Sequence, residues 1–147
     1  MQICTIIKRK KLYQFNWLNM KKDLENRQDI ELLVEKFYEK VFVDETIGHI
    51  FTDFMNVKPE THFPVMADFW ETVLFAKDRY HGNVIIKHVN IDKVYALKSH
   101  HFERWIALFF ETIDELFEGK ITEVAKIRVN SMAMVLQAKI KFYQHQE

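Results

Sequence analysis

Apolar residues recur at intervals of three and four over most of the chain, a spacing that places them on one face of a helix. The first such run predicts a helix over 29–43, with a turn or 3₁₀ piece at 46–51 and a loop to Asn56 after it. A second helix is predicted over 59–75, because Pro59 suits a first helical turn and Pro64 follows early enough to be tolerated. Ser99 is expected to cap a long helix that Gly119 closes in a left-handed conformation, and a last helix is predicted over 122–143.

Each predicted helix has a stripe that should face the core. Phe102, Trp105 and Phe109 define the stripe of the long helix that follows Ser99. The stripe of the last helix is expected to contain four branched residues, with two methionines as flexible fillers. These residues are Val124, Ile127, Val135 and Ile140, with Met132 and Met134.

The segment 84–89 is the ambiguous one, because it is apolar apart from Lys87 and His88 and its periodicity also fits a strand. No partner strand is evident, which favours a short helix or an irregular segment. The three Gly and two Pro of the chain are too few for the turns of a β-sandwich or barrel. The sequence therefore predicts an all-α fold, and 147 residues suit one domain.

The charges are unevenly distributed, although 21 basic and 21 acidic residues give a net charge of zero. The first 22 residues hold six basic side chains and no acidic one, so the remainder carries −6. We expect a poorly packed basic arm over 1–28 and a globular domain over 29–147. The arm is either a frayed terminus, which we favour, or a tether to a membrane surface or nucleic acid. Whether translation starts at Met1 or at Met20 stays open.

Cellular location is indicated by weak signals. Cys4 is the one cysteine, so no internal disulfide can form, and no apolar run is long enough to span a membrane. The apolar residues of 1–11 precede the basic ones, which is the reverse of a secretory signal. A cytoplasmic protein is expected, and the neutral total gives no argument for a nucleic-acid partner.

Seven histidines suggest metal chemistry, but no His-Glu-x-x-His or Glu-x-x-His pair occurs, and no glycine-rich phosphate loop is present. His62 and His88 lie within apolar patterns, where a histidine is usually a core residue with a satisfied hydrogen bond. His100 and His101 open a helix and are expected in solvent. Tyr38 and Trp105 each carry a polar hydrogen into the predicted core, and Trp105 does so from the stripe that holds Phe102 and Phe109. Together they suggest a polar guest there.

Five short strings, in order, carry a resemblance to a known family. They are Phe-Tyr-Glu-Lys-Val (37–41), Ile-Gly-His-Ile-Phe (47–51), His-Phe-Pro-Val-Met-Ala-Asp-Phe-Trp (62–70), Tyr-His-Gly-Asn with a histidine eight residues after the tyrosine (80–88), and His-Phe-Glu-Arg-Trp (101–105). Over residues 29–143 the chain resembles the group III truncated hemoglobins. The resemblance implies a truncated globin fold, a two-over-two α-helical sandwich around a heme b.

The resemblance also implies roles for individual residues. His88 matches the proximal histidine that binds the heme iron, and Tyr38, His62 and Trp105 match the distal pocket. The porphyrin would be packed by Phe51, Met66 and Phe69, and its propionates would meet Lys87, Arg79 or Tyr80.

The function implied is binding of O₂, NO or another diatomic gas, with the distal donors stabilising the negative charge that O₂ gains on iron. Several distal donors suggest gas scavenging, or an enzyme that turns NO and O₂ into nitrate or uses peroxide. Such an enzyme would receive electrons from an unidentified reductase. Simple reversible O₂ binding stays open. The alternative from another class is a heme-free helical interaction module in which His88 and His62 are only core residues.

Overall fold

The fold is all-α over residues 20–146, the part of the chain that the computed structural model describes, and no strand occurs there. The elements are α2 (Arg27–Val43), a π-helical turn η1 (Ile50–Phe54), α3 (Pro59–Phe75), α4 (Val84–Val94), α5 (Ser99–Leu116) and α6 (Lys120–Gln144). No helix in this part is long and apolar enough to cross a membrane.

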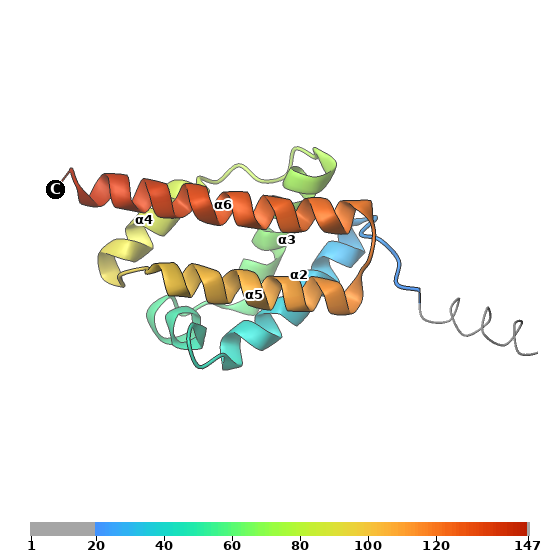
Figure 1. Cartoon of the computed structure of the whole chain (residues 1–147), viewed down its shortest axis with the longest axis horizontal. Coiled ribbons are helices and arrows are strands. Elements are labelled where there is room, and N and C mark those ends of the chain that lie inside the picture. The colour runs from blue at the N-terminus through green and yellow to red at the C-terminus, as the bar shows by residue number, and fades with distance from the viewer. Residues whose placement is uncertain (1–19, 147) are drawn as a thin grey trace, which may run out of the picture.

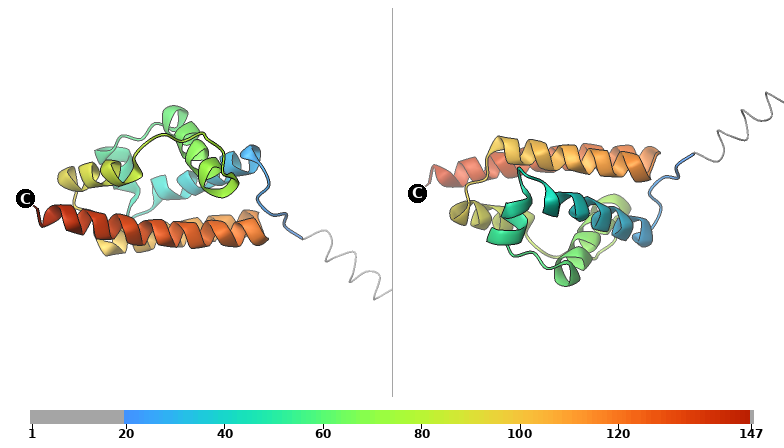
Figure 2. Two further views of the ribbon diagram at one scale, coloured as in Figure 1. Left: turned by 90° about the horizontal axis from the view of Figure 1, so that it is seen from above. Right: turned by 90° about the horizontal axis from the view of Figure 1, so that it is seen from below.

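The helices form two layers. α5 and α6 run side by side in opposite directions, with α2 and α3 behind them (Figure 1). The view along the layers shows α6 on one side and α2, α3 and α4 on the other (Figure 2). α2 packs on both α3 and α5, while α4 packs on α6. This arrangement confirms the predicted all-α sandwich.

The core lies where α2 meets α3 and α5. Asn26 caps α2, its side chain accepting a hydrogen bond from the Asp29 backbone N–H at 3.1 Å. The predicted inward stripe of α2 is buried, as shown by Ile30 and Val41, which have no exposed surface. On α5, Phe109 stacks on Trp70 of α3, with ring centroids 5.0 Å apart. Aromatic pairs thus join the two layers.

The packed domain extends to the N-terminal side of Asp29. Leu24 is buried, and the Asp23 carboxylate accepts hydrogen bonds from the backbone N–H groups of Ile121 and Thr122 at 2.8 Å each. Asp23 therefore caps the start of α6 from the segment that leads into α2. The segment from Lys22, which the sequence assigns to the basic arm, thus contacts the domain, since the Lys22 carbonyl also accepts a hydrogen bond from the Glu118 backbone N–H at 3.0 Å. Residues 1–19 are outside the described part.

Two predicted helix boundaries were wrong. Lys98, not Ser99, is the N-cap of α5, and the Lys98 backbone N–H donates to His101 Nδ1 at 3.0 Å. Gly119 does not end α5, which stops at Leu116; it is the N-cap of α6, with φ +155°. A Cβ on Gly119 would lie 2.4 Å from the Asp23 Cγ, so the capping carboxylate needs a glycine there.

The ambiguous segment at 84–89 is the first half of α4, so the strand alternative is wrong. Asn83 starts this helix by accepting a hydrogen bond from the Ile86 backbone N–H at 3.0 Å. The segment predicted as a loop to Asn56 contains η1, whose wide turn presents Ile50 and Phe51 to the interior.

The expected inward face of α6 was partly wrong. Ile127, Met134 and Val135 are exposed, with 64%, 72% and 49% of their surface accessible. The buried face is instead Thr122, Ala125, Val129, Ala133, Leu136 and Ile140. This face combines small residues such as Ala125 and Ala133 with larger ones such as Leu136.

Candidate functional site

A single cavity of about 440 Å³ contains most of the residues singled out from the sequence. It lies between the two layers, and every described helix and η1 contribute to its wall. Nine of the ten predicted site residues line it: Tyr38, Phe51, His62, Met66, Phe69, Tyr80, Lys87, His88 and Trp105. Its volume and mostly apolar wall are typical of a small-molecule or cofactor site.

His88 is held in one tautomer by its own helix. The His88 Nδ1 lies 2.8 Å from the Val84 carbonyl oxygen, which can only accept a hydrogen bond, so Nδ1 carries the proton. Burial lowers the pKa of His88, and the neighbouring Lys87 lowers it further, against the raising effect of the Val84 carbonyl. His88 is therefore neutral near pH 7, and its Nε2 keeps a lone pair for a metal.

Tyr38 and His62 form a hydrogen-bonded pair in the same cavity. The Tyr38 hydroxyl oxygen lies 2.7 Å from His62 Nε2, and the two rings are nearly perpendicular. Burial lowers the pKa of His62, with a smaller contribution from Lys87, and burial raises the pKa of Tyr38. Both groups are thus neutral at pH 7. The pair then holds two protons, which are distributed over the Tyr38 oxygen and the two ring nitrogens of His62.

Trp105 is the second donor of the cavity. Its ring packs edge-on against Phe37 with centroids 5.6 Å apart and stacks on Phe109 at 6.2 Å. No side chain or carbonyl within residues 20–146 accepts a hydrogen bond from the indole N–H. Trp105 is half-buried and lines the cavity, so this N–H is available to a guest there.

Phe51, Met66 and Phe69 supply apolar wall from η1 and α3. Phe51 packs edge-on against Tyr38, with ring centroids 5.9 Å apart. Phe69 contacts the Tyr80 ring in the same way at 5.3 Å. These contacts fix flat aromatic surfaces beside the polar pair, which suits a planar apolar guest.

The three predicted propionate partners separate in the structure. Tyr80 and Lys87 line the cavity, and the Lys87 ammonium lies 5.6 Å from the centroid of the Tyr80 ring. Arg79 is outside the lining, and its guanidinium Nε lies 3.8 Å from a Glu71 carboxylate oxygen. Lys87 and Tyr80 are therefore better placed than Arg79 to meet an anionic group at the cavity edge.

Several lining residues escaped the sequence analysis. His101 was expected in solvent but is 9% exposed and lines the cavity, because its Nδ1 accepts a hydrogen bond from the backbone N–H of the N-cap Lys98. α6 contributes Met132, Ala133 and Leu136 to the wall. Their i, i+1, i+4 spacing indicates a common helix face. The sequence analysis missed it because other large apolar residues of α6 lie on a different face.

The donor set fits a heme better than a protein-only metal site. No group of three or more His, Cys, Asp or Glu side chains within residues 20–146 could hold a metal ion. One neutral imidazole on an apolar slot suits an iron whose other ligands come from a porphyrin. The cavity also has the Lys87 ammonium at its edge, which suits carboxylates, and two hydrogen-bond donors inside it, Tyr38 and Trp105.

The chain is similar to several truncated hemoglobins. The group 3 truncated hemoglobin ctb of Campylobacter jejuni is 28% identical over 127 residues, which cover 84% of this chain and 98% of that protein. The group 1 truncated hemoglobin GlbN of Synechocystis is 29% identical over 101 residues, 67% of this chain and 79% of that protein. The crystal structure of the group III truncated hemoglobin from Campylobacter jejuni superposes with a TM-score of 0.74 at 27% identity, covering 82% of this chain and 95% of that one. No protein-family model matches the chain.

Proposed function

Since this chain belongs to the group III truncated hemoglobins, we propose that it binds one heme b through His88 and takes up O₂ or another diatomic gas beside Tyr38 and Trp105. The globin family implies a heme that binds a diatomic ligand. The identity of the porphyrin and the roles of the individual residues are our proposal.

The observation that carries the proposal is the protonation of His88. Because Nδ1 donates to the Val84 carbonyl oxygen at 2.8 Å, the unprotonated nitrogen is Nε2, and the side chain lines the cavity. Such an imidazole is oriented and neutral before any metal arrives, so binding costs neither a proton nor a rotation.

Heme bound here would supply a ferrous iron that binds diatomic gases. The protein controls the gas through hydrogen bonds, and the Tyr38 and His62 pair can be arranged in two ways. If the Tyr38 hydroxyl donates to His62, it has no hydrogen left for the gas. If the His62 Nε2–H donates to the Tyr38 oxygen, the hydroxyl hydrogen is free to donate to the gas.

The second arrangement suits a gas that carries partial negative charge. In it, Tyr38 and the Trp105 indole N–H both donate to the guest, inside a cavity whose wall is mostly apolar. His62 then orients the Tyr38 hydroxyl without contacting the gas itself. Slow release of O₂ follows, which favours scavenging or chemistry on NO or peroxide over delivery of O₂. Turnover of that kind needs electrons from a reductase.

The absorption spectrum of the purified protein tests this proposal. We expect an intense Soret band in the ferric form, and a sharp band shift when the dithionite-reduced protein is exposed to CO. A folded, colourless protein that takes up no added hemin would instead support a heme-free helical interaction module.

The choice between carrier and enzyme needs a kinetic experiment. The O₂-loaded protein is mixed with NO, and nitrate is measured along with the rate at which a flavin reductase restores the ferrous form. Stoichiometric nitrate with repeated turnover supports NO dioxygenation. Immeasurably slow reduction would leave O₂ binding as the function.

A further inference from the structure

A second tyrosine and histidine pair lies outside the set of residues assigned to the gas. The Tyr95 hydroxyl oxygen lies 2.8 Å from His49 Nε2, and the two ring centroids are 5.5 Å apart. Tyr95 is the C-cap of α4, and His49 precedes η1 directly. The pair thus bridges two elements that both contribute to the cavity wall.

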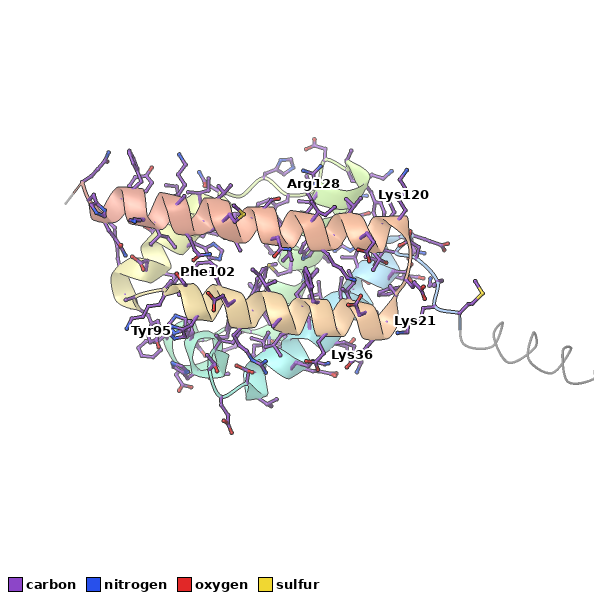
Figure 3. All side chains as sticks on the ribbon, in the orientation of Figure 1. Lys21, Lys36, Tyr95, Phe102, Lys120 and Arg128 are labelled. Carbon is purple, nitrogen blue, oxygen red and sulfur yellow. The ribbon has the colours of Figure 1, made fainter. Side chains whose placement is uncertain are left out.

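Tyr95 lies between the cavity and the molecular surface. On the inner side, its ring centroid is 5.8 Å from that of His101, which lines the cavity. On the outer side, it is 4.5 Å from the ring of Phe54, whose surface is 52% exposed. Figure 3 places Tyr95 at the end of the molecule where α4 leads into α5. Aromatic rings therefore connect the cavity edge to solvent through Tyr95.

This geometry suits one-electron oxidation of a phenol. A phenol holds its proton at neutral pH, and losing an electron makes that proton strongly acidic, so oxidation is easy only if a base takes the proton. A base must lie within hydrogen-bond reach to do so, about 2.6–3.2 Å. His49 Nε2 at 2.8 Å from the Tyr95 hydroxyl meets that requirement.

The two tyrosine and histidine pairs differ in access to solvent. Tyr38 is 2% exposed and points into the gas pocket, where its hydroxyl is already required. Tyr95 has a partly exposed aromatic neighbour, so an external reductant can reach its side of the molecule. Within residues 20–146, Tyr38 and Tyr95 are the two tyrosines hydrogen-bonded to a histidine.

We propose that Tyr95 and His49 form a redox-active pair that carries oxidising equivalents from the cavity to small reductants at the surface. Tyr95 gives one electron to an oxidant generated from hydrogen peroxide in the cavity, its O–H bond breaks, and the proton forms a new N–H bond at His49 Nε2. A phenolic reductant in solution then returns one electron and the His49 proton returns to the tyrosyl oxygen. Two such cycles supply the two electrons with which hydrogen peroxide and two protons become two waters.

This inference rests on the proposed function, since the oxidant forms in the heme cavity. It adds a substrate class, small one-electron donors such as phenols. It also assigns their contact to a site separate from the gas pocket.

The first test uses the full-length ferric protein mixed with hydrogen peroxide and frozen rapidly for electron paramagnetic resonance. We expect a tyrosyl radical that is lost in Tyr95→Phe and retained in the matched control Tyr143→Phe. His49→Gln keeps a hydrogen-bond acceptor but removes the base, so radical formation should slow on the order of 100-fold. A purely structural role of the pair would leave that rate unchanged in a folded His49→Gln protein.

The second test needs no bound heme. The purified full-length chain is oxidised by laser flash with a ruthenium sensitiser and an external electron acceptor, and the tyrosyl absorbance is followed. We expect Tyr95 to give most of the yield, with a slower rise in His49→Gln. A yield that is unaffected by Tyr95→Phe would overturn the inference. A colourless protein with normal Tyr95 oxidation would contradict the proposed function while supporting the pair.

Discussion

The Tyr38 hydroxyl on α2 and the His62 Nε2 on α3 lie 2.7 Å apart, so two helices of one layer are joined by a hydrogen bond inside the cavity. Burial keeps both groups neutral, through a lowered pKa of His62 and a raised pKa of Tyr38. The hydroxyl hydrogen of Tyr38 therefore has two possible acceptors, His62 and the gas. Their competition determines how tightly the gas is held.

Tyr38→Phe removes that hydroxyl while keeping the ring. A hydrogen bond to a partly charged oxygen is worth roughly 1.5–3 kcal/mol, so the O₂ dissociation rate should rise about 10- to 150-fold. Stopped-flow displacement of O₂ by CO measures the rate. Tyr143→Phe, at the surface of α6, is the matched control. An unchanged rate in Tyr38→Phe would mean that the hydroxyl stays bonded to His62 in the gas-bound state.

Trp105→Phe tests the second donor. Its hydrogen bond would go to the same partly charged oxygen and is worth roughly 1.5–3 kcal/mol, so O₂ release should again become about 10- to 150-fold faster. Because Tyr38 and Trp105 would share one small ligand, the double variant should deviate from the sum of the single effects. Strict additivity would show that the two donors do not act on the same guest.

Lys87 and Arg79 give a matched pair for the cavity edge, because only Lys87 lines the cavity. Lys87→Ala should speed heme transfer to an excess of apomyoglobin a few-fold, since a solvent-exposed ion pair is worth about 0.2–1 kcal/mol. Arg79→Ala should leave the transfer rate unchanged. The reverse result would place the propionates at Arg79.

Asp23→Asn tests the contact between the segment before α2 and the start of α6. Burial tends to raise the pKa of Asp23, but hydrogen bonds from the backbone of Ile121, Thr122 and Leu24 and from the Thr122 hydroxyl outweigh it and lower the pKa. The variant should lower the free energy of unfolding by about 1 kcal/mol at pH 7.

The sign of the pH effect follows from the lowered pKa of Asp23. Its stabilising contribution is present above the unfolded value of about 3.9 and is lost as the pH falls through the lower folded value. The difference between wild type and Asp23→Asn in urea unfolding should therefore shrink below pH 4. A difference that grows on acidification would contradict the capping role.

The helices were predictable from sequence where one face is both apolar and large, as in α2, whose inward residues Ile30 and Val41 are fully buried. The face of α6 was not, because the small residues Ala125 and Ala133 are buried while the larger apolar Ile127 is exposed. The periodicity of a sequence identifies faces by their hydrophobicity, whereas a tightly packed interior also selects side chains by their volume.

The candidate site was predicted from the order of five strings, and nine of its ten residues do line one cavity. His101 was missed because its burial depends on a hydrogen bond to the Lys98 backbone, which no side-chain pattern reveals. The contact between Tyr95 and His49, 46 residues apart, was likewise invisible, since it depends on how η1 meets the end of α4.

His88→Gly, titrated with imidazole, tests the central claim most directly. The glycine leaves room for a free imidazole beside α4, so the account predicts a ferric protein with an altered Soret band that returns to the wild-type spectrum as imidazole is added. The matched control is His101→Gly, which removes another cavity histidine and should keep the wild-type spectrum without imidazole. A wild-type spectrum in His88→Gly before imidazole is added, or loss of the axial ligand in His101→Gly alone, would contradict the account.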